Sequence, residues 1–203
     1  RADFDARYNV PFHRLDRAAY EAAAPVPTEK TFKAIVLENE YLQLTILPEL
    51  GGRLYSCRFK PLGPTGQEIF YHNPVLKPSY WGPFARDENW WLAAGGMEWA
   101  WPISEHGYEW GESWSHTTTQ TAEEVSVTVW DSPVEDRLRA QVVISLPAGV
   151  SYFSLRPRLE NRMDRAANCQ FWINAMLTLG HNSVSPNTRF VCLSDLVWVH
   201  GTA

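Results

Sequence analysis

The chain has 203 residues, of which 45% are hydrophobic and 20% are charged, a composition typical of an ordinary globular protein. This length suffices for one sizeable β domain and is short for two. The net charge of −5 and the lack of any lysine or arginine run argue against a nucleic-acid partner, and the longest apolar runs are far too short to span a bilayer. We therefore predict neither a nucleic-acid surface nor a membrane segment.

No signal-peptide pattern opens the sequence, so we predict a cytoplasmic protein, although the sequence begins at Arg1 rather than at a methionine. Three cysteines, Cys57, Cys169 and Cys192, are odd in number and widely spaced. This pattern is typical of free, mostly buried thiols rather than of a disulfide framework or a zinc site.

No glycine-rich phosphate loop leads from a strand into a helix, which argues against nucleotide binding. His106, Glu109 and His116 could be metal ligands, but Gly107 and the irregular context give no helical metal-binding motif, so we expect no metal and no other cofactor.

Residues 1–30 are polar and rich in alanine and proline. We predict that they form an N-terminal arm that lies on a main domain spanning residues 31–203. Within the arm, the pattern predicts a short helix at 16–24, because Pro25 and Pro27 cannot continue it.

Beyond the arm the hydrophobic period changes to two. This predicts strands at about 32–38 and 41–47, joined by a turn at Glu38-Asn39-Glu40. A third strand is predicted at 53–59 and a short one at 68–71.

Residues 72–116 show little regular pattern, and prolines at positions 74, 78 and 83 punctuate their first part. We therefore predict a long loop. A loop of this length inside a compact domain is usually functional.

After residue 117, β-branched and aromatic residues return in five segments, 123–132, 137–147, 152–162, 167–179 and 190–200. Strand follows strand with no helical pattern between them, which predicts antiparallel pairing. The fold class that we predict is all-β, a large antiparallel β-sandwich with a short N-terminal helical arm.

The segment 90–116 combines six of the ten tryptophans with several glutamates and histidines. Its aromatic members are Trp90, Trp91, Trp99, Trp101, Trp110 and Trp114, and its ionisable members are Glu98, Glu105, His106, Glu109, Glu112 and His116. Buried carboxylates without partners are unfavourable, so we interpret the segment as a concave site with aromatic walls. Indole faces stack on sugar rings and carboxylates accept from hydroxyls, which predicts a sugar ligand. The alternative is a tryptophan-rich satellite core.

Glu98 follows Gly95-Gly96, which lets a ligand approach closely, and we predict a catalytic or sugar-contacting carboxylate. The alternative is an ion pair with a core arginine such as Arg53. Arg53 follows Gly51-Gly52, which we expect to supply a positive φ or a close backbone approach. Its guanidinium either binds a carboxylate or phosphate of the ligand or pairs with a glutamate. His106 is either a site residue or an exposed loop histidine.

If residues 110–116 are extended, the side chains at even positions share one face. This places Glu112 and His116 beside two tryptophans as a substrate-binding pair, and it turns Glu109 away. Glu98 and Glu112 are also candidates for the two carboxylates of a glycosidase.

Four stretches of the chain form a signature when they occur in this order: YLQLTILPELGGRLYS, GQEIFYHNPVLKP, AAGGMEWAWP and FWINAMLTL. They resemble the galactose mutarotase-like superfamily, and within it most closely the DUF5107 domains often found beside tetratricopeptide repeats in bacteria. The resemblance covers about residues 31–200. It implies a β-supersandwich with a sugar site on the concave face of one sheet. It also implies further C-terminal strands in the family's longer domains, with the glutamate that serves as base in true mutarotases.

True mutarotases open and close a hexose ring with an acid and a base on opposite sides of the sugar. The resemblance implies two histidines that flank the sugar, and His106 is the nearest match to the first. Imidazole suits the acid because it ordinarily titrates near neutral pH. The second histidine follows an asparagine in the family, whereas this chain reads Ile173-Asn174-Ala175. The missing histidine argues against true mutarotase activity, but Asn174 can still hold a sugar hydroxyl.

We therefore predict a carbohydrate-binding, mutarotase-like domain that acts on a sugar by acid/base chemistry, as an aldose-epimerase-like isomerase or a glycosidase relative. The predicted catalytic residues are Glu98 and His106, and the predicted substrate-binding residues are Arg53, Trp99, Trp101, Glu112, His116 and Asn174. The alternative is a non-catalytic carbohydrate-binding or interaction module of a larger protein. The expected partners are a sugar or short glycan, together with further domains of the full-length chain or a second copy in a homodimer.

Overall fold

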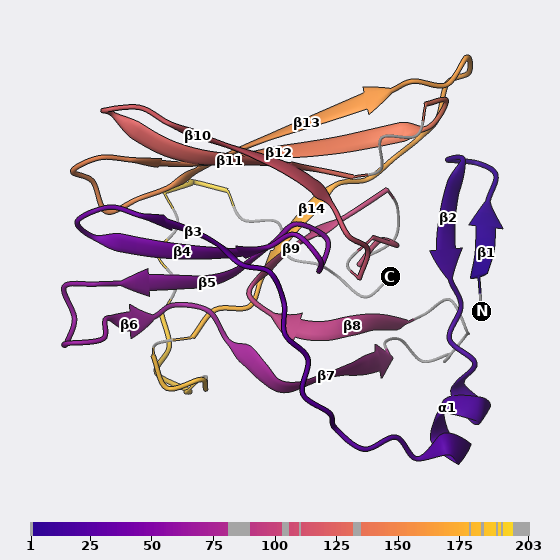
Figure 1. Cartoon of the computed structure of the whole chain (residues 1–203), viewed down its shortest axis with the longest axis horizontal. Helices are drawn as coiled ribbons and strands as arrows, with labels where there is room; N and C mark the ends of the chain where they lie inside the picture. Colours follow the sequence, from indigo (N-terminus) through magenta and orange to yellow (C-terminus); the bar gives the residue numbers. More distant parts are fainter. Residues whose placement is uncertain are drawn as a thin grey trace.

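The computed structural model describes residues 2–80, 90–102, 106–109, 111–131, 135–178, 180–183, 185–189, 191 and 193–196. Two antiparallel sheets face each other across a shared hydrophobic core, and Figure 1 shows them as stacked layers. This arrangement confirms the predicted all-β class and the antiparallel β-sandwich.

The larger sheet has six strands in the order β14-β9-β5-β4-β3, with β6 paired to β5. Its strands are β3 (Ile35–Glu38), β4 (Leu42–Leu47), β5 (Arg53–Phe59), β6 (Gln67–Glu68), β9 (Met97–Ala100) and β14 (Trp172–Ala175). The first three predicted strands are confirmed, although the first begins only at Ile35. Asn39 closes the turn between β3 and β4, because its Oδ1 accepts from the backbone N–H groups of Tyr41 and Leu42 at 2.9 and 2.8 Å.

The smaller sheet contains β10 (Ser115–Gln120), β11 (Glu124–Trp130), β12 (Leu138–Pro147) and β13 (Ser154–Asn161), in this order. Alternate residues of β11 and β12 face the larger sheet, as the period of two predicts. The core between the sheets includes Leu44, Ile46, Leu54, Val127, Val142 and Ile144, which are fully buried. Each such side chain contributes roughly 1.5–3 kcal/mol relative to leaving it exposed.

The N-terminal residues form a hairpin, β1 (Ala2–Asp5) and β2 (Val10–His13), followed by α1 (Arg17–Ala23), and Figure 1 shows them beside the sheets. Tyr8 and Val10 belong to the common core, so this part of the predicted arm is packed into the domain. The predicted helix is confirmed, and Asp16 caps it by accepting from the N–H of Ala19 at 3.0 Å. No helix among the described residues is long and apolar enough to cross a membrane.

The prediction of a long loop over 72–116 is wrong for much of its described part. This region contains β7 (His72–Tyr80), β8 (Trp90–Gly95), β9 and the start of β10. Pro74 is compatible with β7 because it lies between His72 and Lys77, where the register with β8 shifts and a missing N–H needs no partner. Pro78 lies opposite Leu92 in the regular part, and it is tolerated because β7 has a neighbour on one side only in its two-stranded sheet. Pro83 lies outside the described residues.

The later predicted strands are shorter or absent. Within the described part of the predicted strand at 167–179, only Trp172–Ala175 is a strand. The strand predicted at 68–71 is wrong for most of its length, because β6 ends at Glu68 and Phe70 makes only an isolated bridge with Leu177. Residues 191 and 193–196, the described part of the strand predicted at 190–200, form no strand, and Leu193 is fully exposed. Apolar residues alone do not make a strand without a neighbour that satisfies the backbone hydrogen bonds.

Two of the three cysteines lie in the described residues, and both are free, as predicted. Cys57 is buried, and burial raises the pKa of its thiol to about 12, so it stays protonated. Cys169 is exposed, which corrects the expectation of burial for this position, and Cys192 lies outside the described residues.

We expect Gly96→Ala to destabilise the protein more than Gly63→Ala. Both glycines have positive φ, 72° and 80°, but a Cβ at Gly96 would lie 2.7 Å from the carbonyl oxygen of Leu54, whereas a Cβ at Gly63 meets nothing within 4 Å. An alanine with positive φ is strained at both positions, so the difference between the two variants measures the steric contact at Gly96 alone. We expect this difference to be about 1–3 kcal/mol in the free energy of unfolding. Urea denaturation measures it; equal losses would contradict the crowding at Gly96.

Candidate functional site

The register of three neighbouring strands brings one row of polar side chains together. Leu54 of β5 lies opposite Met97 of β9, and both side chains belong to the core. The adjacent positions, Arg53 and Glu98, therefore share the face of the sheet that is turned away from the core. Asn174 of β14 lies directly opposite Glu98. The row thus crosses β5, β9 and β14.

Glu98 is the centre of this row. Its Oε2 accepts from Arg53 Nη2 at 2.8 Å, and its Oε1 accepts from Asn174 Nδ2 at 2.9 Å. The side chains of Arg53 and Glu98 are only 0% and 1% exposed. The second nitrogen of the guanidinium, Nη1, donates to the carbonyl oxygen of Gly95 at 2.7 Å. Arg53 is thus engaged in the ion pair that the sequence offered as the alternative, rather than directed at a ligand.

His106 completes the cluster from the loop that follows β9. Its Nδ1 lies 2.8 Å from Glu98 Oε1, and its ring stacks on Trp91 with centroids 4.2 Å apart and an interplanar angle of 3°. The loop folds back so tightly that a Cβ at Gly107, with φ of 67°, would overlap the backbone of Trp101. The backbone N–H of Tyr108 donates to the carbonyl of Trp101 at 2.8 Å and closes this turn.

The carboxyl group of Glu98 is ionised despite its burial. Desolvation raises its pKa, but the hydrogen bond from His106, the charge of Arg53 and the hydrogen bond from Asn174 together lower it below the ordinary value. An ionised carboxylate can only accept hydrogen bonds, so we assign a proton to Nδ1 of His106. In the tautomer that this assignment gives, Nε2 is the acceptor nitrogen of the ring. Such a carboxylate–imidazole pair can act in acid/base chemistry.

The prediction that Trp99 and Trp101 line an open groove is wrong. They are 2% and 0% exposed and belong to the core. Glu98 and Trp99 are neighbours on β9, and successive side chains of a strand point to opposite faces. Because Glu98 points away from the core, Trp99 points into it. Trp114 is also buried, and Trp110 and Glu105 lie outside the described residues.

Residues 111–114 do not belong to an extended strand, because β10 begins only at Ser115. The backbone N–H of Glu112 donates to the carbonyl of Glu109 in a turn, and the Glu112 carboxylate pairs with His13 at 3.1 Å. His116 lies in β10, opposite Val129 in the smaller sheet. Glu112 and His116 therefore do not form the predicted pair.

Glu109 belongs to a second buried cluster that the sequence did not indicate. Its carboxylate pairs with Arg137, whose Nη2 also lies 3.3 Å from Asp131 Oδ2. Trp101 Nε1 donates to the same Asp131 oxygen at 3.1 Å. Burial raises the pKa of both carboxyl groups, and for Glu109 the charge of Asp131 raises it further, because one guanidinium has to neutralise two carboxylates. No local spacing predicts the pairing, since Glu109 and Arg137 are 28 positions apart.

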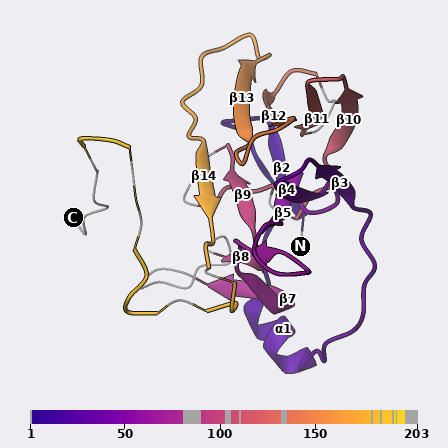
Figure 2. The same ribbon diagram turned by 90° about the vertical axis from the view of Figure 1, so that its left-hand side faces the viewer.

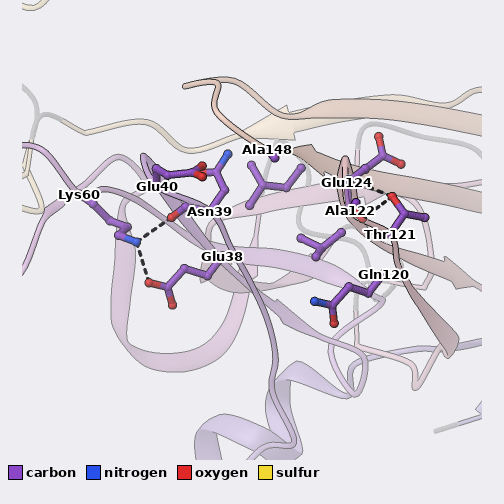
Figure 3. A pocket seen from close by; sticks show the side chains of 11 residues that line it. Glu38, Asn39, Glu40, Lys60, Gln120, Thr121, Ala122, Glu124 and Ala148 are labelled. Carbon is purple, nitrogen blue, oxygen red and sulfur yellow. Dashed lines mark hydrogen bonds and ion pairs between the residues drawn. The ribbon is translucent and has the colours of Figure 1, made fainter.

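Several hollows lie away from these clusters and contain none of the predicted site residues, and two of them bear on the fold. The first, of about 430 Å³, lies where the β3–β4 turn meets the β10–β11 turn, and Figure 3 shows Glu38, Lys60 and Glu124 among its lining. Lys60 pairs there with Glu38 at 2.8 Å. The second, of about 1000 Å³, separates residues 25–31 from β7.

Comparison with known proteins identifies a family to which the chain is similar and a solved structure of similar fold. The family model described as "Domain of unknown function (DUF5107)" matches residues 13–191. The structure is that of a TPR-domain containing protein from Parabacteroides distasonis, with a TM-score of 0.55 and 24% sequence identity over 75% of this chain. The present chain spans only 23% of that protein's length. The likeness supports the fold alone.

We expect Glu98→Gln to lower the free energy of unfolding by about 3–5 kcal/mol, because it leaves the buried guanidinium of Arg53 without a counter-charge. Glu38→Gln is the matched control, since it removes the same charge from an ion pair whose glutamate is 47% exposed. That loss should stay under about 1 kcal/mol. Urea denaturation compares the two; a small loss for both would contradict the role of the Arg53–Glu98 pair.

The cluster of Glu109, Asp131 and Arg137 should make stability fall as the pH rises. Both carboxyl groups have raised pKa values in the folded state, so the folded protein binds protons more tightly than the unfolded chain. Stability is therefore lost as the pH rises from the ordinary carboxyl range towards neutrality. Asp131→Asn should reduce this loss by more than about 1 kcal/mol between about pH 5 and pH 8. Parallel denaturation series test this, and identical slopes would contradict it.

Proposed function

Since the chain belongs to the DUF5107 family, we propose that it is a carbohydrate-binding domain in which His106 exchanges a proton with a sugar hydroxyl. The observation that carries this proposal is the 2.8 Å contact between His106 Nδ1 and the buried, ionised carboxylate of Glu98. A carboxylate held in this way orients the imidazole and stabilises the protonated ring when it forms.

The groups around His106 suit a polar, ring-shaped ligand. Asn174 supplies an amide beside Glu98, and Trp91 supplies an aromatic surface beside the imidazole. The predicted isomerase-like chemistry fits better than glycoside cleavage, which needs two carboxylates flanking the bond. Glu112, the other predicted carboxylate, pairs with His13 instead of joining Glu98 at this cluster. In this proposal His106 is the catalytic residue and Glu98 is a positioning residue.

A second candidate function is an interaction module of a larger protein. Trp172 and Ile173 on β14 are each 44% exposed, and β14 lies at the edge of the larger sheet, as Figure 2 shows. The burial of Trp99 and Trp101 also removes two of the aromatic surfaces expected for a sugar. Further domains of a longer chain or a second copy are the partners that such a surface would contact.

The test is a thermal-shift screen of the full-length protein against monosaccharides and short glycans. A sugar that binds the folded state raises the midpoint by mass action. The pure α-anomer of the hit is then followed by polarimetry, and we expect His106→Ala to slow anomerisation by about 10²–10⁴-fold. His181→Ala, at an exposed histidine, is the matched control and should change nothing.

The outcomes separate the candidates. Saturable binding without turnover would overturn proton exchange and leave a sugar-binding module. No stabilisation by any sugar would overturn the proposal and favour the interaction module. Glu98→Asp keeps the charge that neutralises Arg53 but shortens the side chain that contacts His106. A shifted pH profile of turnover in this variant would show that Glu98 positions His106. A purely structural role in the ion pair would leave the pH profile unchanged.

A further inference from the structure

The outer face of the smaller sheet carries a group of arginines. Ala140, Val142 and Ile144 of β12 are fully buried and point towards the core. The intervening side chains, including Arg139, therefore point outward. On the paired strand β13, Arg156 and Arg158 lie on the same outward face, opposite Val143 and Gln141 of β12. This sheet is an outer layer of the molecule in Figure 1.

The arginines outnumber the carboxylates near them. Arg158 pairs with Glu160 at 2.5 Å, and Arg162 pairs with Glu160 at 3.0 Å and with Glu135 at 3.2 Å. Arg156 donates only to a neutral hydroxyl, that of Ser145 at 3.1 Å, and makes no ion pair within the described part of the chain. A chain with a net charge of −5 thus concentrates excess positive charge on one face.

Arg139 adds to this face a hydrogen-bond donor, its Nε, that has no acceptor among the described residues. This Nε is buried. Its guanidinium carbon lies 6.0 Å from the ring centroid of Trp130. Trp130 is directly opposite Gln141, which is directly opposite Arg158, so an indole, an amide and a guanidinium form a row across three strands. Thr117 and Thr128 form a parallel row of hydroxyls beside it.

The edge strand β13 is unsuited to pairing with a further strand from a partner. β13 is the edge strand next to β12, and Pro157 lies at its centre between two arginines. Proline lacks the N–H that a further strand would need, and charged side chains also discourage pairing at an edge. A partner is therefore recognised by the side chains of the face rather than by the backbone of the edge.

We propose that this arginine face, formed by Trp130, Arg139, Gln141, Arg156 and Arg158, binds a carboxylated oligosaccharide. Guanidinium groups match carboxylates in geometry and charge. An indole ring stacks on the C–H face of a sugar, and amide and hydroxyl groups bond its hydroxyls. An acidic peptide would use the charge but not the indole and hydroxyl rows. The site lies on the other sheet from His106, so it does not depend on the function proposed above.

The test measures binding of a galacturonic acid oligosaccharide to the full-length protein by calorimetry. The matched ligand is its methyl ester, which keeps the sugar and removes the charge. We expect saturable binding of the acid, at least tenfold weaker binding of the ester, and weaker binding of the acid at high salt. Arg156→Ala with Arg158→Ala should weaken binding of the acid by at least about tenfold. Lys33→Ala with Arg189→Ala removes the same charge from two exposed positions elsewhere and should not change it.

Three results would overturn the proposal. The first is that the acid and the ester bind with equal affinity. The second is that the Arg156/Arg158 variant binds the acid as tightly as the unmodified protein. The third is that a polyglutamate peptide binds as tightly as the oligosaccharide. The last would show that charge alone is recognised. His106→Ala should leave this binding intact, and if it abolished binding the site would be the one on the larger sheet. Circular dichroism of each variant establishes that it is folded before its binding is compared.

Discussion

The buried ion pair between Arg53 and Glu98 is the interaction on which the candidate site depends. Neither side chain is accessible to water, so each charge is tolerated because the other neutralises it. The pair joins β5 to β9, and the second oxygen of Glu98 then holds Asn174 from β14 and His106 from the following loop. One carboxylate on β9 therefore contacts side chains from three other segments, namely β5, β14 and the loop after β9.

The cluster around Arg137 contains two carboxylates for one guanidinium, whereas the cluster around Glu98 contains one carboxylate for one guanidinium. At Glu98, one carboxylate faces one guanidinium and two further donors, and its pKa falls below the ordinary value. At Arg137, two carboxylates share one guanidinium in an equally buried place, and the pKa values of both rise. The number of donors per buried carboxylate decides whether its pKa falls below or rises above the ordinary value.

Sequence reasoning identified the polar members of the site better than its aromatic ones. Arg53, Glu98, His106 and Asn174 were all candidates, and the structure brings them into one cluster. The tryptophans were misplaced because the segment that holds them was interpreted as a loop. A loop imposes no alternation, whereas a strand that turns Glu98 outward must turn its neighbour Trp99 towards the core.

The sequence by itself determined the all-β class, the antiparallel pairing of the strands and the short helix before Pro25. These follow from a period of two, from prolines and glycines at turns and from the two prolines that end the helix, all of which act within a few residues. Only the tertiary structure decided that Arg53 pairs with Glu98, 45 positions away, and that Glu112 does not join them. The reason is that sheet register, not local sequence, sets which side chains become neighbours across strands, and a shift of one residue would turn each of them to the opposite face.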